Sequence, residues 1–358
     1  MTRASGRNAL RPGRAPWGGL ALFCALLTIA GGESSLAREA ESSLGEETSG
    51  EISLIKPLAA RSLLLDAATA GSLTVAVGER GHVLLSRDQG VSWSQAVVPT
   101  RATLTGVFLL DERHCWVVGH DAVILRTGDG GTSWELLYSA PEEQRPLLDV
   151  WFEDELKGFA IGAYGFFLET SDGGATWTDR LIVESEPTED DPYAFDSGAD
   201  VHLNHVARSE SGRLYVAAEA GMVFRSDDDG ENWIELPSPY PGSFFGSLPL
   251  AGDSLLLFGL RGNLYRSDDA GETWSSIETG TLAMLTDGIR RPDGSLVIAG
   301  LAGALLVSRD GGASFDLVQQ PDRQGVSSIL PMDDGSLLLV GEYGVSLLGA
   351  EVLGGGGS

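Results

Sequence analysis

Short apolar stretches separated by turn residues recur along most of this chain. In one unit they occupy Leu104–Leu109, Cys115–Val118, Val123–Arg126 and Trp134–Leu137, and polar residues and glycine fill the gaps. Short stretches rich in β-branched and aromatic residues predict strands, and tight turns between them predict an antiparallel meander. The unit therefore predicts one four-stranded sheet.

The turn before the fourth stretch carries a phrase that occurs six times. It reads small hydroxyl residue, any residue, Asp, any residue, Gly, any residue, small polar residue and aromatic residue. Its copies are Ser86–Trp93, Thr127–Trp134, Thr170–Trp177, Ser226–Trp233, Ser267–Trp274 and Ser308–Phe315. Successive aspartates lie 41 to 56 residues apart. A period near forty predicts an array of small sheets that bury their cores against one another.

We interpret this phrase as structural. Its Asp can accept backbone N–H groups, its Gly permits positive φ, and its aromatic ring begins the fourth strand and packs on neighbouring strands. Six copies on six equivalent turns cannot converge on one active site. The residues concerned are Asp88, Trp93, Asp129, Trp134, Asp172, Trp177, Asp228, Trp233, Asp269, Trp274, Asp310 and Phe315.

A second motif precedes each phrase and occurs seven times. An apolar strand ends at a small residue, followed by two variable residues and usually a second small one. The copies are Gly78–Gly81, Gly119–Ala122, Gly162–Gly165, Ala218–Gly221, Gly259–Gly262, Gly300–Gly303 and Gly341–Gly344. Seven units of four strands predict an all-β, seven-bladed propeller over residues 52–349.

The seventh unit stops after its third strand. Ser53–Pro57, near the start of the predicted propeller, parallels Asp316–Val318, which belongs to the fourth strand of the preceding unit. We therefore expect the N-terminal strand to close the last blade and to remove an exposed sheet edge.

The N-terminal sequence predicts that the protein is exported, and the C-terminal sequence predicts a tail. Residues 1–37 combine a basic start, the apolar stretch Trp17–Ala30 and the small residues Ser35–Ala37, as in a cleaved secretory signal peptide. The apolar stretch is shorter than the roughly 20 residues that a membrane-spanning helix needs. We expect residues 38–51 to be flexible, residues 350–358 to be a tail or linker remnant, and the protein to be periplasmic.

The net charge of the chain limits the kinds of partner that it can bind. The formal net charge is −27 at pH 7, which disfavours binding to nucleic acid or to an anionic membrane surface. The insertion at residues 184–200 is rich in carboxylates, which could bind Ca²⁺, but their spacing matches no known calcium loop and acidic runs are usually solvated. His202 and His205 should point to opposite faces of a strand. We expect no metal, no cofactor and no catalytic residues.

The alternation of strand directions places the second motif and the first one on opposite faces of the disc. Loops on a rigid scaffold are where binding residues concentrate, so we expect partner contacts on the face of the second motif. The candidate residues are Glu79, Arg80, His120, Asp121, Tyr164, Glu219, Arg261, Glu342 and Tyr343.

The two motifs together resemble a known family. Gly259–Trp274 and Gly119–Trp134 couple the glycine turn to the aspartate phrase, with Arg266 and Arg126 before its first residue. This combination is similar to Asp-box (BNR-type) repeats and, more narrowly, to the photosystem II stability/assembly factor-like propellers. The resemblance implies an exported, non-catalytic scaffold that binds protein partners during assembly of membrane complexes.

The resemblance leaves the partner open. Relatives occur in non-photosynthetic bacteria, often encoded beside resistance–nodulation–division-type exporters, and the acidic charge departs from the arginine-rich patch associated with photosynthetic members. We therefore expect a bacterial, non-photosynthetic relative that is a monomer on its own and binds a membrane complex or transporter. The alternative is a carbohydrate-binding protein or an Asp-box glycoside hydrolase, which would need two carboxylates flanking the scissile bond.

Overall fold

The computed structural model describes residues 52–183 and 201–354, which lie within one compact unit. The predicted signal peptide, residues 38–51, the acidic insertion at 184–200 and the last four residues lie outside the described residues. In the part of the chain that is described, no helix has the length and apolar character needed to cross a membrane.

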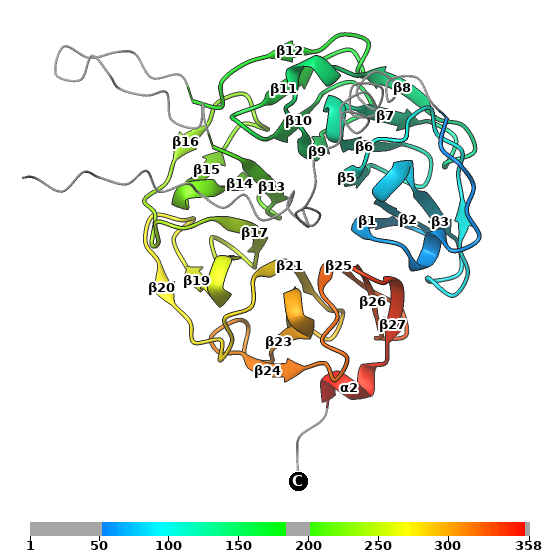
Figure 1. Ribbon diagram of the computed structural model, residues 1–358. Coiled ribbons are helices and arrows are strands. Elements are labelled where there is room, and N and C mark those ends of the chain that lie inside the picture. Colours follow the sequence, from blue (N-terminus) through cyan, green and yellow to red (C-terminus); the bar gives the residue numbers. More distant parts are fainter. Residues whose placement is uncertain (1–51, 184–200, 355–358) are drawn as a thin grey trace, which may run out of the picture. The chain divides into compact units, whose positions relative to one another are not determined.

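Seven antiparallel sheets surround a central axis as the blades of a propeller (Figure 1). Blade one contains β1 (Leu64–Ala70), β2 (Leu73–Gly78), β3 (Val83–Ser86) and β4 (Ser94–Gln95). Blade two contains β5 (Leu104–Leu109), β6 (Cys115–Gly119), β7 (Ile124–Thr127) and β8 (Glu135–Tyr138). Blade three contains β9 (Leu147–Phe152), β10 (Gly158–Gly162), β11 (Phe167–Thr170) and β12 (Thr178–Asp179); blade four contains β13 (Leu203–Arg208), β14 (Leu214–Ala218), β15 (Val223–Ser226) and β16 (Ile234–Glu235).

The remaining blades complete the ring. Blade five contains β17 (Phe244–Pro249), β18 (Leu255–Gly259), β19 (Leu264–Ser267) and β20 (Ser275–Ser276); blade six contains β21 (Leu285–Arg290), β22 (Leu296–Gly300), β23 (Ala304–Ser308) and β24 (Asp316–Gln319). Blade seven has three strands, β25 (Val326–Pro331), β26 (Leu337–Gly341) and β27 (Gly344–Leu348), followed by the short helix α2 (Ala350–Gly354). One-turn 3₁₀ helices are η1 (Ala59–Arg61), η2 (Glu79–Gly81), η3 (His120–Ala122), η4 (Pro141–Glu143), η5 (Glu219–Gly221), η6 (Leu260–Gly262) and η7 (Leu301–Gly303). The seven-bladed architecture confirms the prediction from the repeats.

The core lies between neighbouring blades. Every residue of β6 is buried, and the same holds for the second strand of the other blades. Such strands are covered on both faces, which explains why they are nearly continuous apolar runs. Between blades two and three, Trp116 stacks on Phe152 with ring centroids 3.8 Å apart. Each sheet is therefore too thin to hold a core alone and depends on its neighbours.

Arginines join successive blades near their outer edges. Arg87 donates to the carbonyl of Gly130 (2.8 Å), and Arg225 donates to that of Ala270 (3.0 Å) in the next blade. Equivalent bonds run from Arg126 to Gly173, from Arg180 to Gly230 and from Arg266 to Gly311. The accepting carbonyl belongs in each case to an Asp-box turn, so the arginines bind blade to blade.

The ring closes by packing of blade one against blade seven. Leu64, Ala67 and Leu84 of blade one share an apolar cluster with Val340 of blade seven. The predicted strand exchange is not confirmed, because β25–β27 form a three-stranded sheet in the described residues. Ser53 instead exchanges two hydrogen bonds with Val98, beside blade one.

Helix α2 occupies the position where blade seven lacks an Asp-box turn. Leu353 is 1% exposed and joins the apolar cluster between blades six and seven. Its carbonyl accepts a hydrogen bond from Arg309, as the Asp-box carbonyls of blades two to six do from other arginines. Helix α2 therefore packs on the propeller through Leu353.

Candidate partner-binding face

One backbone hydrogen bond fixes the second motif in all seven blades. We call the first strand of each blade its inner strand. The N–H of the motif's second residue donates to the carbonyl of the residue that immediately precedes the inner strand of the same blade. The pairs are Glu79 to Leu63, His120 to Thr103, Ala163 to Pro146, Glu219 to His202, Leu260 to Ser243, Leu301 to Met284 and Glu342 to Gly325, at 2.8–3.2 Å. These turns and the entries to the inner strands therefore lie on one face, which we call the glycine-turn face.

The first residue of the motif is glycine in six blades because the inner strand approaches closely. A Cβ at Gly259 would lie 2.4 Å from the carbonyl oxygen of Ser243, nearer than real Cβ contacts allow. The strand entry therefore packs directly on the backbone of the turn.

In blades one to six the third residue of the turn adopts a left-handed conformation. Its φ is between 55° and 59° at Arg80, Asp121, Tyr164, Ala220, Arg261 and Ala302. In blade seven the left-handed residue is Gly344, which follows Tyr343. Such a conformation costs roughly 1–2 kcal/mol per residue for most side chains. Because alanine adopts it in two blades, the conformation belongs to the repeat, and the side chain at this position is free to vary.

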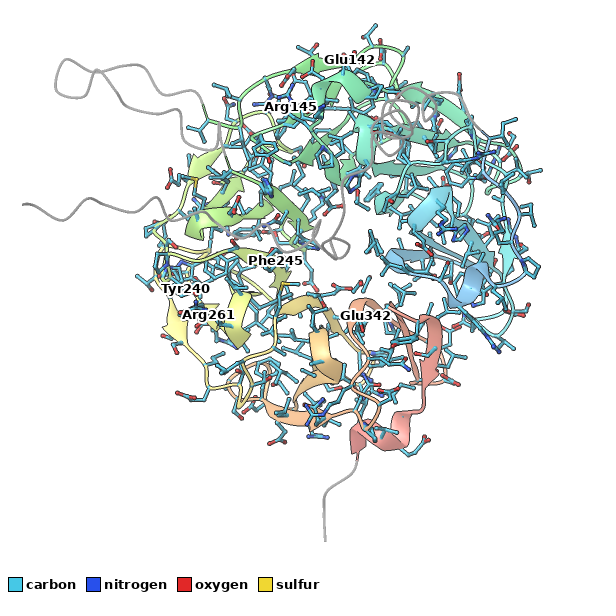
Figure 2. All side chains as sticks on the ribbon, in the orientation of Figure 1. Glu142, Arg145, Tyr240, Phe245, Arg261 and Glu342 are labelled. Atoms are coloured by element: carbon cyan, nitrogen blue, oxygen red, sulfur yellow. The ribbon has the colours of Figure 1, made fainter. Side chains whose placement is uncertain are left out.

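Five of the nine predicted residues are exposed at the tips of these turns or beside them. Tyr164 and Tyr343 are 54% and 63% exposed, and Arg80, Arg261 and Glu342 are also exposed. Figure 2 shows Arg261 and Glu342 over blades five and seven, with Phe245 at the inner strand of blade five. The nine residues come from six blades, so the structure spreads them around a rim and does not gather them in one pocket.

The three predicted glutamates also make contacts within the protein. Glu342 accepts a hydrogen bond from the N–H of Gly325 (3.0 Å), and Glu219 lies 3.8 Å from Nδ1 of His202. Glu79 lies 3.9 Å from Arg80. These carboxylates therefore stabilise the glycine turns and also contribute negative charge to the face.

His120 and Asp121 are half-buried in the turn of blade two. Burial lowers the pKa of His120, so the imidazole is neutral near pH 7. The carbonyl of Asp121 accepts the N–H of Ala140, which leads to the next blade. Both residues therefore contribute less exposed surface than Tyr164 or Arg261.

Sequence reasoning missed two apolar side chains on the same face. Leu58 and Leu282 are 65% and 85% exposed and lie in the segments that enter the inner strands of blades one and six. No motif marks these connections, because they differ in length and composition between repeats.

The Asp-box carboxylates lie at the opposite face and are used within their own turns. In the second copy, Asp129 accepts hydrogen bonds from Thr127 Oγ1, from the N–H of Ser133 and from Ser133 Oγ, at 2.6–2.9 Å. These bonds lower the pKa of Asp129 to about 2, and the equivalent bonds have the same effect at Asp172 and Asp269. A carboxylate that stabilises its own turn in this way has little capacity left for a ligand.

Four ionisable residues occupy equivalent positions of inner strands. Asp66, Asp149, His205 and Asp287 each follow the register shift of their strand. Each aspartate accepts the N–H of its own neighbour and an N–H from the next blade: Val107 for Asp66, Val206 for Asp149 and Ile329 for Asp287. The three carboxyl groups therefore link adjacent inner strands.

Burial of these groups favours their neutral forms. It raises the pKa of Asp66 to about 8 and that of Asp149 to about 7, and it lowers the pKa of His205. A polar residue at this register position of an otherwise apolar strand is the one sequence signal that could have indicated them. In the described residues, no group of three or more His, Cys, Asp or Glu side chains is placed to hold a metal ion.

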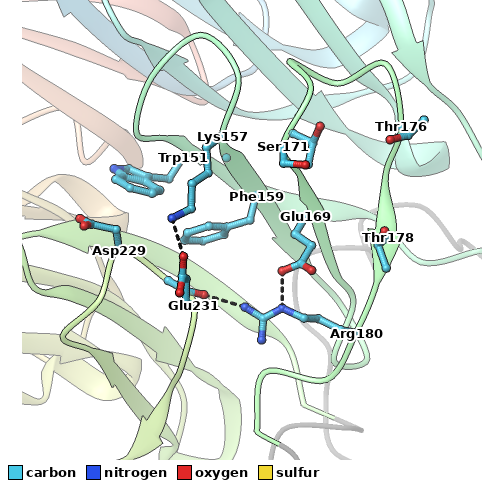
Figure 3. A pocket seen from close by; sticks show the side chains of 13 residues that line it. Trp151, Lys157, Phe159, Glu169, Ser171, Thr176, Thr178, Arg180, Asp229 and Glu231 are labelled. Carbon is cyan, nitrogen blue, oxygen red and sulfur yellow. Dashed lines mark hydrogen bonds and ion pairs between the residues drawn. The ribbon is translucent and has the colours of Figure 1, made fainter.

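A pocket of about 410 Å³ lies between blades three and four on the Asp-box side (Figure 3). Its charged groups are paired: Lys157 Nζ lies 3.1 Å from Glu231, and Arg180 Nε lies 2.6 Å from Glu169. Trp151 and Phe159 behind them are buried. The pocket joins residues up to 80 positions apart and presents few unpaired polar groups, so it is a weaker candidate than the glycine-turn face.

Comparison with known proteins agrees with the repeat analysis. A family model described as "Photosynthesis system II assembly factor YCF48" matches residues 137–299. Photosystem II assembly protein Ycf48 of Thermosynechococcus vestitus is 40% identical over 43 residues, which are 12% of this chain and 12% of that protein. The chloroplastic photosystem II stability/assembly factor HCF136 of Cyanidioschyzon merolae is 32% identical over 102 residues, 27% of this chain and 22% of that protein. The alignments thus span less than a quarter of either relative.

Solved structures share the fold over most of the chain. The structure titled "YCF48 bound to D1 peptide" has a TM-score of 0.64 at 20% identity and covers 85% of this chain and 97% of its own. A streptogramin B lyase structure has a TM-score of 0.66 at 12% identity, covering 84% and 97%. At these identities the likeness concerns the fold alone, which serves both a peptide-binding protein and an enzyme.

Proposed function

Because this chain is a photosystem II assembly factor-like propeller, we propose that it is an exported, non-catalytic scaffold that binds a protein of a membrane or periplasmic complex through its glycine-turn face. The related propeller solved with a D1 peptide supports a polypeptide ligand. A bacterial exporter of the resistance–nodulation–division type is the first membrane complex to examine, and the periplasm is the compartment that the N-terminal sequence favours.

One observation carries this proposal. Over residues 52–183 and 201–354, the exposed aromatic side chains are Tyr164 and Tyr343, and both belong to glycine turns. Aromatic residues and arginine are enriched at protein interfaces, where they supply much of the binding energy. Exposed Arg80, Arg261, Leu58 and Leu282 add guanidinium and apolar surface to the same face.

Contact with a neighbouring ring orients the exposed side chain of Tyr164. Tyr164 packs edge-on against His202, with ring centroids 5.0 Å apart, so its ring is held upright while half of it stays open to solvent. A ring held in this way loses little side-chain entropy on binding.

Crosslinked affinity purification from native membranes and periplasm, with quantitative mass spectrometry, tests the proposal. We expect wild-type protein to recover one membrane complex and the double variant Tyr164→Ala/Tyr343→Ala to recover about tenfold less, the loss that corresponds to ~1.4 kcal/mol. Leu156→Ala is the matched control, because Leu156 is 57% exposed in blade three on the Asp-box side.

Melting temperatures separate binding from folding. All three proteins should melt within a few degrees of one another, since exposed side chains contribute little to stability. Equal loss of recovery with Leu156→Ala would contradict the choice of face. Recovery of no protein partner would favour the carbohydrate-binding alternative, which glycosidase assays would then test.

A further inference from the structure

Blade seven presents an incomplete sheet. Each of the other six sheets adds a fourth strand outside its third, whereas β27 is the last strand of its sheet in the described residues. The 3₁₀ turn η1 covers the Gly344 end of β27, where the carbonyl of Ala60 approaches Gly344, and α2 follows its Leu348 end. The edge between these two elements is free of hydrogen bonds from other parts of residues 52–183 and 201–354.

The edge of β27 differs in composition from the outer strands of the other blades. Proteins protect sheet edges with short strands or charged side chains. Four of the six outer strands, β4, β12, β16 and β20, have two residues, and the longer β8 and β24 begin with Glu135 and Asp316. In contrast, β27 has five residues, Gly-Val-Ser-Leu-Leu, and none is charged.

The exposure of β27 fits a missing neighbour. Ser346 and Leu347 are exposed, whereas the third strands of complete blades bury their central side chains, as at Ile124 and Leu125 of β7. In an antiparallel sheet, alternate residues turn their N–H and C=O groups away from the paired strand. The outward groups of β27 therefore form a template for an added strand.

Charge around this edge is predominantly negative. Residues 326–354 contain Asp333, Asp334, Glu342 and Glu351, all exposed, and no Lys, Arg or His. One exposed cation, Arg61 of η1, lies beside Gly344 at one end of the strand. The nearest arginines from blade six are occupied, because Arg291 pairs with Asp293 and Arg309 with Asp316. A net charge of −27 also opposes pairing of this edge with a second copy of the chain.

We propose that β27 accepts an extended, lysine- or arginine-bearing segment of a partner polypeptide as the fourth strand of blade seven. Main-chain hydrogen bonds to the edge provide affinity, and the surrounding carboxylates select basic side chains. This surface adjoins the glycine turn of blade seven, which contains Glu342 and Tyr343, but the hydrogen-bonding edge itself belongs to β27, so the proposal does not depend on the glycine turns of the other blades binding the partner of the proposed function.

Two capped peptides serve as probes, one alternating lysine with valine and one alternating glutamate with valine. Fluorescence anisotropy with the full chain should show binding of the lysine peptide and at least tenfold weaker binding of the glutamate peptide. Hydrogen exchange followed by mass spectrometry should show that the lysine peptide slows exchange in the segment that contains β27 and leaves the outer strands of other blades unchanged.

Matched variants distinguish strand addition from general attraction to an acidic protein. Ser346→Lys places a like charge opposite the incoming strand and should weaken binding about fivefold, whereas Ser346→Glu should keep or strengthen it. Ser276→Lys on β20 adds the same charge at another exposed serine of an outer strand and should leave affinity unchanged.

Three results would overturn the proposal. The first is equal loss of binding in Ser346→Lys and Ser276→Lys. The second is no protection of β27 by the bound peptide. The third is a wild-type dimer in sedimentation that Ser346→Lys dissociates, because this would assign the edge to a second copy of the chain. The single variant Tyr164→Ala, in the glycine turn of blade three, should bind the lysine peptide normally even where it weakens recovery of the partner complex, so failure here and failure of the proposed function give different results.

Discussion

At the scale of single residues, the Asp-box aromatics differ in burial although the phrase around them is constant. Trp233 is 6% exposed and contacts Phe159 edge-on, with ring centroids 5.7 Å apart, while Trp134 and Trp274 are half-buried. Trp274 also directs its N–H to Pro237 rather than to a carbonyl of its own turn. The phrase therefore specifies the turn, and the neighbouring blade decides how much of the ring is covered.

Trp233→Ala should lower the free energy of unfolding by about 3–5 kcal/mol, because a buried aromatic side chain leaves a cavity. Trp274→Ala should cost clearly less, since solvent already contacts part of its ring. Urea denaturation of the two variants measures the difference. Equal costs would mean that the ring of Trp274 is as well packed as that of Trp233.

At the scale of elements, α2 performs in blade seven the task that an Asp-box turn performs elsewhere. It supplies one buried side chain to the cluster between blades and one carbonyl to an arginine of the preceding blade. A helix can replace a turn here because the requirement is one apolar group and one acceptor, and not a particular backbone path.

Leu353→Ala should therefore destabilise the propeller by about 2–3 kcal/mol. Val352→Ala is the matched control, because Val352 is 42% exposed on the same turn of α2 and its truncation should change stability by less than about 0.5 kcal/mol. Thermal and urea unfolding would report both. A Leu353→Ala variant as stable as wild type would show that α2 only rests on the surface.

At the scale of the whole molecule, the inner strands connect through carboxyl groups that belong to different blades. Asp66 joins blades one and two, Asp149 joins three and four, and Asp287 joins six and seven. Blades five and six meet through apolar contact instead, with the ring of Phe258 against Gly288. The ring is thus held by local bonds of differing chemistry, and their protonation couples its stability to pH.

The raised pKa values of Asp66 and Asp149 make stability fall as pH rises. Their ordinary value is 3.8, and in the folded protein the values are about 8 and about 7. The folded state holds these protons more tightly than the unfolded state, so the contribution is complete below about pH 4 and is lost as pH rises through 7 to 8. We expect the melting temperature to decrease between pH 5 and pH 9.

Asp66→Asn should flatten this pH dependence, whatever its effect on stability at acidic pH, because it removes one titrating group. Asp322→Asn, at an exposed position in the connection between β24 and β25, is the control and should leave the slope unchanged. Differential scanning fluorimetry across the pH range measures both slopes. An unchanged slope in Asp66→Asn would mean that Asp66 is ionised in the folded protein.

Much of the fold could be predicted from the sequence, and less of the candidate face. The repeats predicted the number of blades, the strand order within each and the face shared by the seven glycine turns. They also predicted Tyr164, Arg261 and Tyr343 as tips of those turns, but not the exposed Leu58 and Leu282 beside them. Turn types and alternating burial are local properties, whereas exposure of a connecting segment depends on what the rest of the ring covers.

The sequence by itself determined the blade and its repetition, because glycine turns, Asp-box turns and apolar strands act within some forty residues. Only the tertiary structure decided how the ring is completed: Ser53 lies beside Val98, Leu353 fills the seventh outer position, and within the described residues β27 is the last strand of its sheet. The reason is physical. Closing a ring brings together residues that are hundreds of positions apart, and which of several similar apolar segments fills each place depends on packing that no local pattern encodes.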